Sequence, residues 1–146
     1  MYRRMGSKGR FSNIEKSERF IRNLDSVCQE PKFLEIWMAD LGERSGSLQS
    51  GRRPVLIVSN DKNNRYSSVL NVIPMTTKMN KRNLPCHVEI HDYERFGLNA
   101  PSTIMVEQLT VVDKKDLMFR IGKINDDRIL MDICDAMAVQ FPVLIR

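Results

Sequence analysis

The sequence predicts an α+β protein that is mostly β: a small, strongly bent sheet or barrel, closed by a C-terminal helix and preceded by an extra N-terminal helix. From residue 33 onward, short segments rich in β-branched and aromatic residues alternate with polar loops. Near both ends, apolar residues recur at helical spacing instead. The chain has 146 residues, of which 42% are hydrophobic and 28% charged, so it can bury a core of its own.

Residues 1–31 form the first predicted unit, a basic tail followed by an amphipathic helix. Residues 1–11 are basic and contain glycine, which is typical of a disordered end. Ser12 and Glu15 then match the S-x-x-E capping box, in which both side chains bind the first free amides of a helix. We expect that helix from about Asn13 to Gln29, before Pro31. It packs either on its own domain or against a partner.

Residues 32–146 form the second predicted unit. We expect its strands at residues 33–41, 54–59, 68–75, 87–90, 103–106, 109–112 and 120–124. Loops are expected at 42–52 and 61–67, and a single capped helical turn at 113–117. Asn125, Asp126 and Asp127 place acceptors and negative charge at the start of a last helix, which ends near Pro142.

Composition narrows the classes of function. The net charge of +5 permits a polyanionic partner without requiring one. The three cysteines, Cys28, Cys86 and Cys134, are far apart and indicate neither a disulfide framework nor a zinc site. The only histidines are His87 and His91, so we expect no metal centre and no cofactor. No apolar run approaches the roughly 18 residues of a membrane span, and we expect a cytoplasmic protein.

The most informative segment is GSLQSGRRPVLIVSND, from Gly46 to Asp61. Arg53 stands at the start of an apolar strand, and Pro54 pushes it to an extended conformation. A guanidinium held in this way suits phosphate binding, because its donors form a planar fork. The local sequence is equally compatible with a solvated arginine at a strand start.

Five segments in order resemble the MazF/PemK family of bacterial toxins. They are EIWMADL, GSLQSGRRPVLIVSND, VLNVIPMTTK, LPCHVEI and STIMVEQLTVVDKKDL, which together span about residues 33–140. The resemblance implies an SH3-like barrel of the CcdB/PemK type, usually a homodimer. It also implies a sequence-specific, metal-independent endoribonuclease that cleaves single-stranded RNA (mRNA), inhibits translation and is neutralised by a cognate antitoxin.

The resemblance also assigns roles to single residues. Arg53 and Thr76 align with the catalytic arginine and threonine of the family. Ser47 and Gln49 match the second and fourth positions of its G-S-E-Q loop, but Leu48 stands where many members carry a glutamate. That glutamate is a candidate general base or substrate-orienting group, and Leu48 can be neither. Either another group accepts the proton, or Arg53 acts electrostatically with water or a phosphate oxygen as acceptor, or the activity is weakened.

Further candidates come from the resemblance, for Ser47 and Gln49, and otherwise from side-chain chemistry. The predicted RNA-binding residues are Ser47, Gln49, Arg52, Lys62, Arg65, Tyr66, Lys78 and Lys81. The loop cations among them either follow phosphates or are solvated charges, and Tyr66 offers a stacking platform. His87 is a candidate replacement base or an ordinary strand histidine. Glu107 and Gln108 are expected to be structural hydrogen-bonding residues.

Two other functions stay open at this stage. One is a catalytically weak, RNA-binding or regulatory relative that kept the barrel. The other is a CcdB-like toxin that poisons DNA gyrase, against which the pairing of Arg53 with Thr76 argues.

Overall fold

The structure is a computed structural model, and it describes residues 30–78 and 84–145. The predicted tail, capping box and first helix lie outside the described residues, and so does Lys81. The division of the chain at residue 31 therefore stays a prediction.

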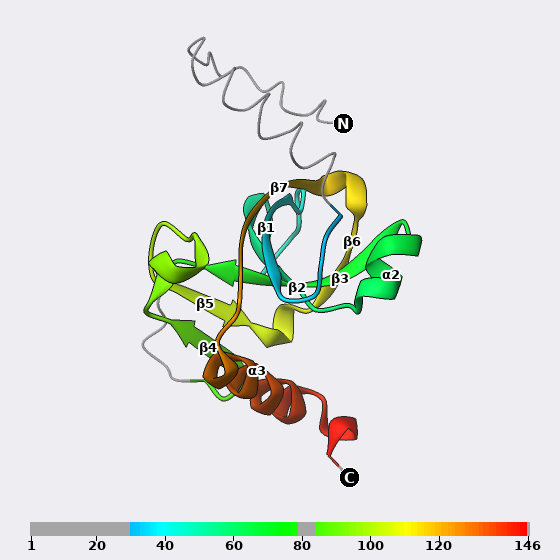
Figure 1. Ribbon diagram of the computed structural model, residues 1–146. Coiled ribbons are helices and arrows are strands. Elements are labelled where there is room, and N and C mark those ends of the chain that lie inside the picture. Colours follow the sequence, from blue (N-terminus) through cyan, green and yellow to red (C-terminus); the bar gives the residue numbers. More distant parts are fainter. Residues whose placement is uncertain (1–29, 79–83, 146) are drawn as a thin grey trace.

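Seven antiparallel strands form the sheet, as the sequence predicts (Figure 1). They are β1 (Glu35–Asp40), β2 (Arg52–Ile57), β3 (Val69–Thr76), β4 (His87–Ile90), β5 (Ser102–Met105), β6 (Thr110–Asp113) and β7 (Leu117–Lys123). Their order in space is β4-β5-β3-β2-β1-β7, with β6 beside β3. The first half of β3 pairs with β6 and its end pairs with β5, so the sheet bends where β3 changes partner.

Within residues 30–78 and 84–145, two α-helices and four short 3-10 helices connect or cover the strands. They are α2 (Asp61–Tyr66), α3 (Asp127–Gln140), η2 (Tyr93–Phe96), η3 (Val106–Gln108), η4 (Lys114–Asp116) and η5 (Pro142–Leu144). The C-terminal helix is confirmed, and it lies along the β4 and η3 side of the sheet (Figure 1). None of the helices described is long and apolar enough to cross a bilayer.

The expectation of a loop at 61–67 is wrong, because this segment forms α2. The Asn60 side chain caps the helix by accepting from the Asn63 amide at 2.8 Å. Asn64 is fully buried, and its side-chain amide donates to the Ser59 carbonyl at 2.9 Å. Because this helix is held by polar side chains, its sequence has no apolar residues at helical spacing from which a helix could be predicted. Three strands also begin earlier than expected, β2 at Arg52, β5 at Ser102 and β7 at Leu117.

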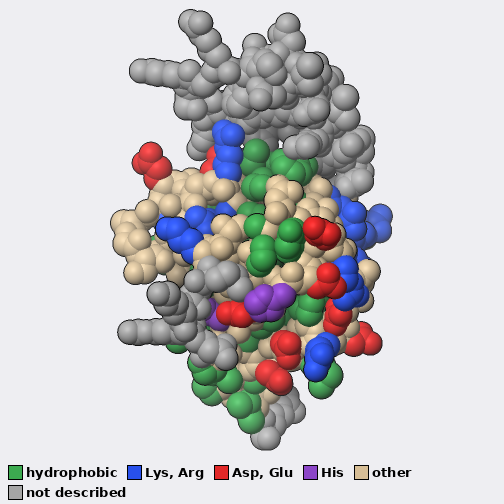
Figure 2. Space-filling model, turned by 90° about the vertical axis from the view of Figure 1, so that its left-hand side faces the viewer, with side chains coloured by type: hydrophobic (Ala, Val, Ile, Leu, Met, Phe, Trp, Pro, Cys, Tyr) green, Lys and Arg blue, Asp and Glu red, His purple; other side chains and the backbone are tan. Residues whose placement is uncertain are grey.

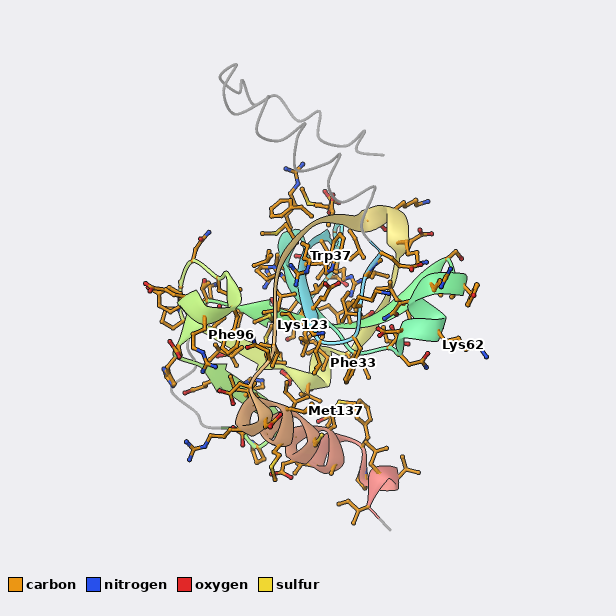
Figure 3. The ribbon with its side chains drawn as sticks, viewed as in Figure 1. Phe33, Trp37, Lys62, Phe96, Lys123 and Met137 are labelled. Carbon is orange, nitrogen blue, oxygen red and sulfur yellow. The ribbon has the colours of Figure 1, made fainter. Side chains whose placement is uncertain are left out.

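Strand β2 is buried on both faces, which explains its uninterrupted apolar run. Leu56 packs into the cluster that includes Ile133 of α3, whereas Val55 and Ile57 pack with Trp37 on the other face. Trp37 is 1% exposed and belongs to the core, as the sequence indicates (Figure 3). The strand that carries Arg53 is therefore held rigidly from both sides.

Candidate active site

Arg53 is fixed at the beginning of β2 by two backbone carbonyl groups. Its Nε donates to the Ser50 carbonyl at 3.0 Å, and Nη1 donates to the Met75 carbonyl at 3.3 Å. These bonds use two of the five guanidinium N–H groups and leave the others for a ligand. Partial burial lowers the pKa of Arg53 from its ordinary value, but a guanidinium stays charged at neutral pH.

Thr76 ends the neighbouring strand β3, directly after the residue that binds Arg53. Its Oγ1 accepts a hydrogen bond from the Lys78 amide at 3.2 Å. This bond orients the side chain and leaves the hydroxyl proton available for donation to a phosphate oxygen. A cation and a hydroxyl donor therefore occupy the same end of two adjacent strands.

Both side chains open into one cavity of about 400 Å³. Its lining consists of Gln49, Arg53, Thr76, Lys78, His87, Thr103 and Met105. The volume lies within the usual range for small-ligand sites, roughly 300–1,000 Å³. The structure thus brings together four of the predicted site residues and adds Thr103 and Met105 from β5, for which the local sequence carries no signal.

Gln108 shapes the loop that bears Leu48. Its Nε2 donates to the Ser47 carbonyl at 3.0 Å, and its Oε1 accepts from the Gln49 amide at 3.3 Å. This is the structural hydrogen bonding expected of Gln108. Ser47 and Leu48 are exposed beside the cavity, with Leu48 55% exposed.

Lys62, Arg65 and Tyr66 lie on α2, at the closed end of the β2–β3 hairpin. Arg53 and Thr76 are at its open end, each four positions along its strand from the Ile57–Val72 pair, or about 13 Å. Figure 3 shows Lys62 pointing away from the body of the molecule. The structure therefore does not bring these three predicted RNA-binding residues to the cavity. Arg52 is exposed and adjacent to Arg53 on β2, and strand alternation places it on the opposite face.

His87 enters the cavity from the first position of β4. Its side chain is 9% exposed, and Nε2 lies 2.6 Å from Oε1 of Glu107, in η3. Nδ1 is buried and makes no hydrogen bond with the described residues. The structure therefore places His87 in the lining of the cavity and pairs it with a carboxylate.

Cys86 joins this pair. One ligating atom from each of Cys86, His87 and Glu107 lies within 4.8 Å of the others. Burial and a hydrogen bond to Glu107 raise the pKa of the Cys86 thiol. The sequence did not predict this cluster of possible ligands, because residue spacing alone does not show that β4 and η3 meet.

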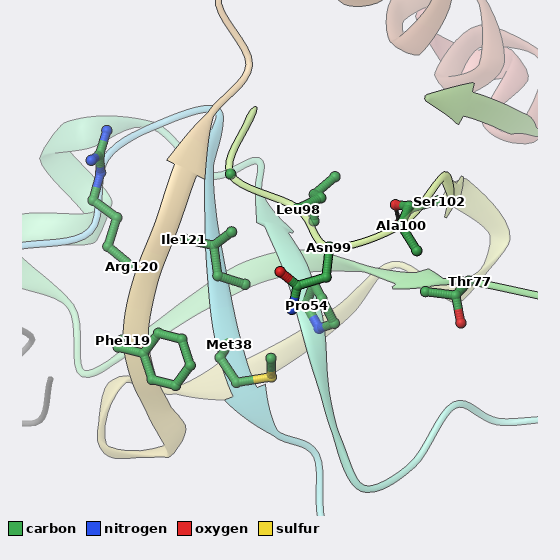
Figure 4. A pocket seen from close by; sticks show the side chains of 11 residues that line it. Met38, Pro54, Thr77, Leu98, Asn99, Ala100, Ser102, Phe119, Arg120 and Ile121 are labelled. Atoms are coloured by element: carbon green, nitrogen blue, oxygen red, sulfur yellow. Dashed lines mark hydrogen bonds between the residues drawn. The ribbon is translucent and has the colours of Figure 1, made fainter. Parts of the chain in front are cut away.

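A second cavity, of about 540 Å³, lies on the other side of β2 (Figure 4). Met38, Pro54, Phe119 and Ile121 contribute an apolar wall to it. The one titratable side chain in its lining, Arg120, is paired with Glu35. This cavity offers shape and apolar contact but brings no catalytic groups together.

The fold and the first cavity define a class: a small, bent-sheet domain that presents a fixed arginine and a hydroxyl donor in one cavity. A family model described as "PemK-like, MazF-like toxin of type II toxin-antitoxin system" matches residues 32–141. The chain belongs to this family.

Individual relatives agree. The chain is 40% identical over 101 residues to "Endoribonuclease EndoA" of Bacillus subtilis (strain 168), covering 69% of this chain and 84% of that protein. Two solved structures share the fold. "Mycobacterium tuberculosis toxin MazF-mt6" has a TM-score of 0.62 at 24% identity, covering 74% of this chain and 96% of that one. MazF (Form-I) from Deinococcus radiodurans has a TM-score of 0.65 at 15% identity, with 78% and 98% covered. The predicted fold class, a mostly β domain with a C-terminal helix, is confirmed.

Proposed function

We propose that this chain is the toxin of a toxin–antitoxin pair, an endoribonuclease that cleaves single-stranded RNA, such as mRNA, without a metal ion. The observation that carries the proposal is the hydrogen bond from Arg53 to the carbonyl that precedes Thr76, which holds two phosphate-directed donors in one cavity. The 40% identity to a protein named an endoribonuclease supports it.

In the proposed reaction, the 2′-oxygen of the RNA attacks the adjacent phosphorus. The bond to the departing 5′-oxygen breaks, which leaves a cyclic phosphate on one product and a 5′-hydroxyl on the other. Arg53 and Thr76 stabilise the negative charge that develops on the non-bridging oxygens. One well-placed donor of this kind is worth about 10²–10³ in rate. Lys78 adds positive charge at the rim.

The reaction also needs a proton acceptor, and Leu48 cannot be one. We assign this role to His87, because its imidazole lies in the same cavity and imidazole suits proton transfer at neutral pH. Nε2 makes the 2.6 Å contact with Glu107 and the other ring nitrogen is buried, so His87 and Glu107 act together as one proton-accepting pair. The chain thus has an alternative to the glutamate that its loop lacks.

The decisive experiment incubates the purified protein with a long RNA in chelator and maps the new 5′ ends. We expect defined cut sites, 5′-hydroxyl products, and resistance of RNA that is 2′-deoxy at the cut. Strict dependence on added divalent metal would contradict the mechanism. RNA binding without cleavage would favour the weak RNA-binding relative, and inhibition of DNA gyrase would favour the CcdB-like alternative.

We also propose a cognate antitoxin as the protein partner, a homodimer as the active form and the cytoplasm as its location. One solved relative is described as an "Endoribonuclease in complex with its cognate antitoxin", with a TM-score of 0.60 at 22% identity, covering 77% of this chain and 96% of that one. The family match begins at residue 32, which supports a boundary between the extension and the nuclease domain. Sedimentation of the toxin, alone and with the candidate antitoxin, tests both assemblies.

A further inference from the structure

Three different ligating groups meet at the wall of the RNA-cleaving cavity. Cys86 immediately precedes β4, His87 opens it, and Glu107 lies in η3, 20 residues further along the chain from His87. Their ligating atoms all lie within 4.8 Å of one another. Figure 2 shows the face on which histidine and acidic side chains lie together.

The donor set has the chemistry of a transition-metal site. A thiolate and an imidazole are preferred ligands of Zn²⁺, whereas Mg²⁺ prefers oxygen ligands only. Zinc commonly takes three protein ligands, with water or substrate in the fourth position. Bonds of about 2.0–2.3 Å would place tetrahedral ligands roughly 3.3–3.7 Å apart, so the present separations need only small side-chain adjustments.

Nε2 is the nitrogen of His87 that faces the other two groups, because it lies 2.6 Å from Oε1 of Glu107. An ion bound by Cys86, Nε2 and Glu107 would take the place of this contact. Nδ1 lies on another edge of the ring, is buried and makes no hydrogen bond with the described residues, so it is not a ligand of this site.

We propose that Cys86, His87 and Glu107 bind one Zn²⁺ ion at the wall of the cavity, and that the bound ion slows RNA cleavage. Binding releases the thiol proton of Cys86 to solvent, because the thiolate is the ligand. The metal then immobilises His87 beside Arg53 and Thr76 and occupies the atoms of the His87–Glu107 pair that would accept the proton. The inhibitory effect rests on the proposed nuclease function, whereas metal binding does not.

The binding experiment uses the full chain, reduced with a non-chelating phosphine, and Co²⁺ as a spectroscopic probe for Zn²⁺. We expect a thiolate-to-cobalt charge-transfer band at one Co²⁺ per chain, displaced by Zn²⁺ but not by Mg²⁺. Cys86→Ser should abolish the band and weaken Zn²⁺ binding by about tenfold or more. Glu107→Gln should weaken binding while keeping the thiolate band.

A matched control uses Cys134. This cysteine is exposed on α3 and lies outside the cluster, so Cys134→Ser should keep the band. Circular dichroism melts verify that each variant folds. No band in the wild-type chain, or a band that survives Cys86→Ser, would overturn the proposed site.

The cleavage experiment measures initial rates in chelator and after addition of Zn²⁺. We expect Zn²⁺ to slow the wild-type chain about tenfold or more and chelator to restore the rate, while the rate of Cys86→Ser should be the same with and without Zn²⁺. Equal inhibition of the wild-type chain and Cys86→Ser would overturn the inhibitory role. If the wild-type chain cleaves no RNA in chelator, the proposed function fails, and the cobalt measurement still decides the metal site.

Discussion

Arg53 owes its position to carbonyl groups on two sides of β2, those of Ser50 in the preceding loop and Met75 in β3. Pro54 fixes the backbone that follows it, and the core holds the strand. An arginine tied at two donors loses little further freedom when it binds phosphate, which favours its use at a reacting centre.

The first prediction concerns this residue. Arg53→Ala should lower kcat/KM for RNA cleavage by about 10²–10³, because the developing phosphate charge loses its main donor. Arg53→Lys should recover little, since an ammonium lacks the fork of donors. Initial rates on a short RNA measure this, with Lys62→Ala on α2 as the matched control. An unchanged rate for Arg53→Ala would show that the site is elsewhere.

Leu48 supplies a second prediction at this scale. Leu48→Glu should alter the cleavage rate or the cut-site preference, because it returns a carboxylate to the loop that Gln108 holds. General-base assistance contributes about 10²–10⁴-fold, so a gain would add an acidic limb to the pH–rate profile. If the carboxylate instead pairs with Arg53 and competes with phosphate, the whole profile falls. An unchanged rate, profile and preference would mean that this loop position does not contact RNA.

At the scale of elements, α3 depends on the cap that Asp126 forms. Its carboxylate accepts from the Arg128 amide at 2.9 Å and the Ile129 amide at 3.2 Å, and it pairs with Arg95 at 2.9 Å. The Ile129 amide, followed by Arg95, lowers the pKa of Asp126. The charged carboxylate is therefore the form that the folded state prefers.

The sign of this shift gives the third prediction. A lowered folded-state pKa contributes stability above the unfolded value, about 3.9 for aspartate, and that contribution disappears as the pH falls through the folded value. Asp126→Asn should keep a cap but flatten the acid limb of a plot of melting temperature against pH, whereas Asp126→Ala should also lower the neutral melting temperature. Melts by circular dichroism measure both. An acid limb in Asp126→Asn as steep as in the wild-type chain would contradict the assignment.

A fourth prediction concerns the contact between η2 and β7. A Cβ added at Gly122 would lie 2.0 Å from the Phe96 carbonyl oxygen, and one at Gly97 would lie 2.3 Å from the Ile121 carbonyl oxygen. Backbone cannot yield cheaply, so Gly122→Ala should cost about 2–3 kcal/mol or more in free energy of unfolding. Gly46 has a positive φ of 66° but open space around its Cβ, so Gly46→Ala should cost only about 1 kcal/mol. Denaturant titration compares them, and equal costs would contradict the close approach.

At the scale of the whole molecule, the net charge of +5 does not say where RNA binds. The structure separates the predicted cations, with Lys78 at the cavity and Lys62 and Arg65 at the far end of the β2–β3 hairpin. The affinity for an RNA bound in the cavity should therefore depend on Lys78 more than on Lys62 or Arg65.

The fifth prediction follows from that separation. Lys78→Ala should weaken RNA binding and reduce the slope of log K against log salt by up to about 0.7, as expected for one lost phosphate contact on a single strand. Lys62→Ala should change neither by a measurable amount. Fluorescence anisotropy at several salt concentrations measures both. A larger effect of Lys62→Ala would show that RNA extends over α2.

Much of the fold was predictable because the signals are local. The apolar run after Pro54 predicts β2, and Asp126 with its neighbours predicts the start of α3, since strand alternation and helix caps act within a few residues. The segment at α2 was not predictable in this way, because its helix depends on the burial of one asparagine rather than on an apolar stripe.

By itself, the sequence determined the class of the fold, the family resemblance and the pairing of Arg53 with Thr76 as candidates. The tertiary structure decided which other groups accompany them. His87, Glu107 and Cys86 lie together only because η3 follows β5, the strand that pairs with β4. Lys62 lies far from the cavity because its helix, α2, connects β2 and β3 at the opposite end of their hairpin. Such meetings depend on strand register and chain reversal over tens of residues, which local patterns of hydrophobicity and charge do not encode.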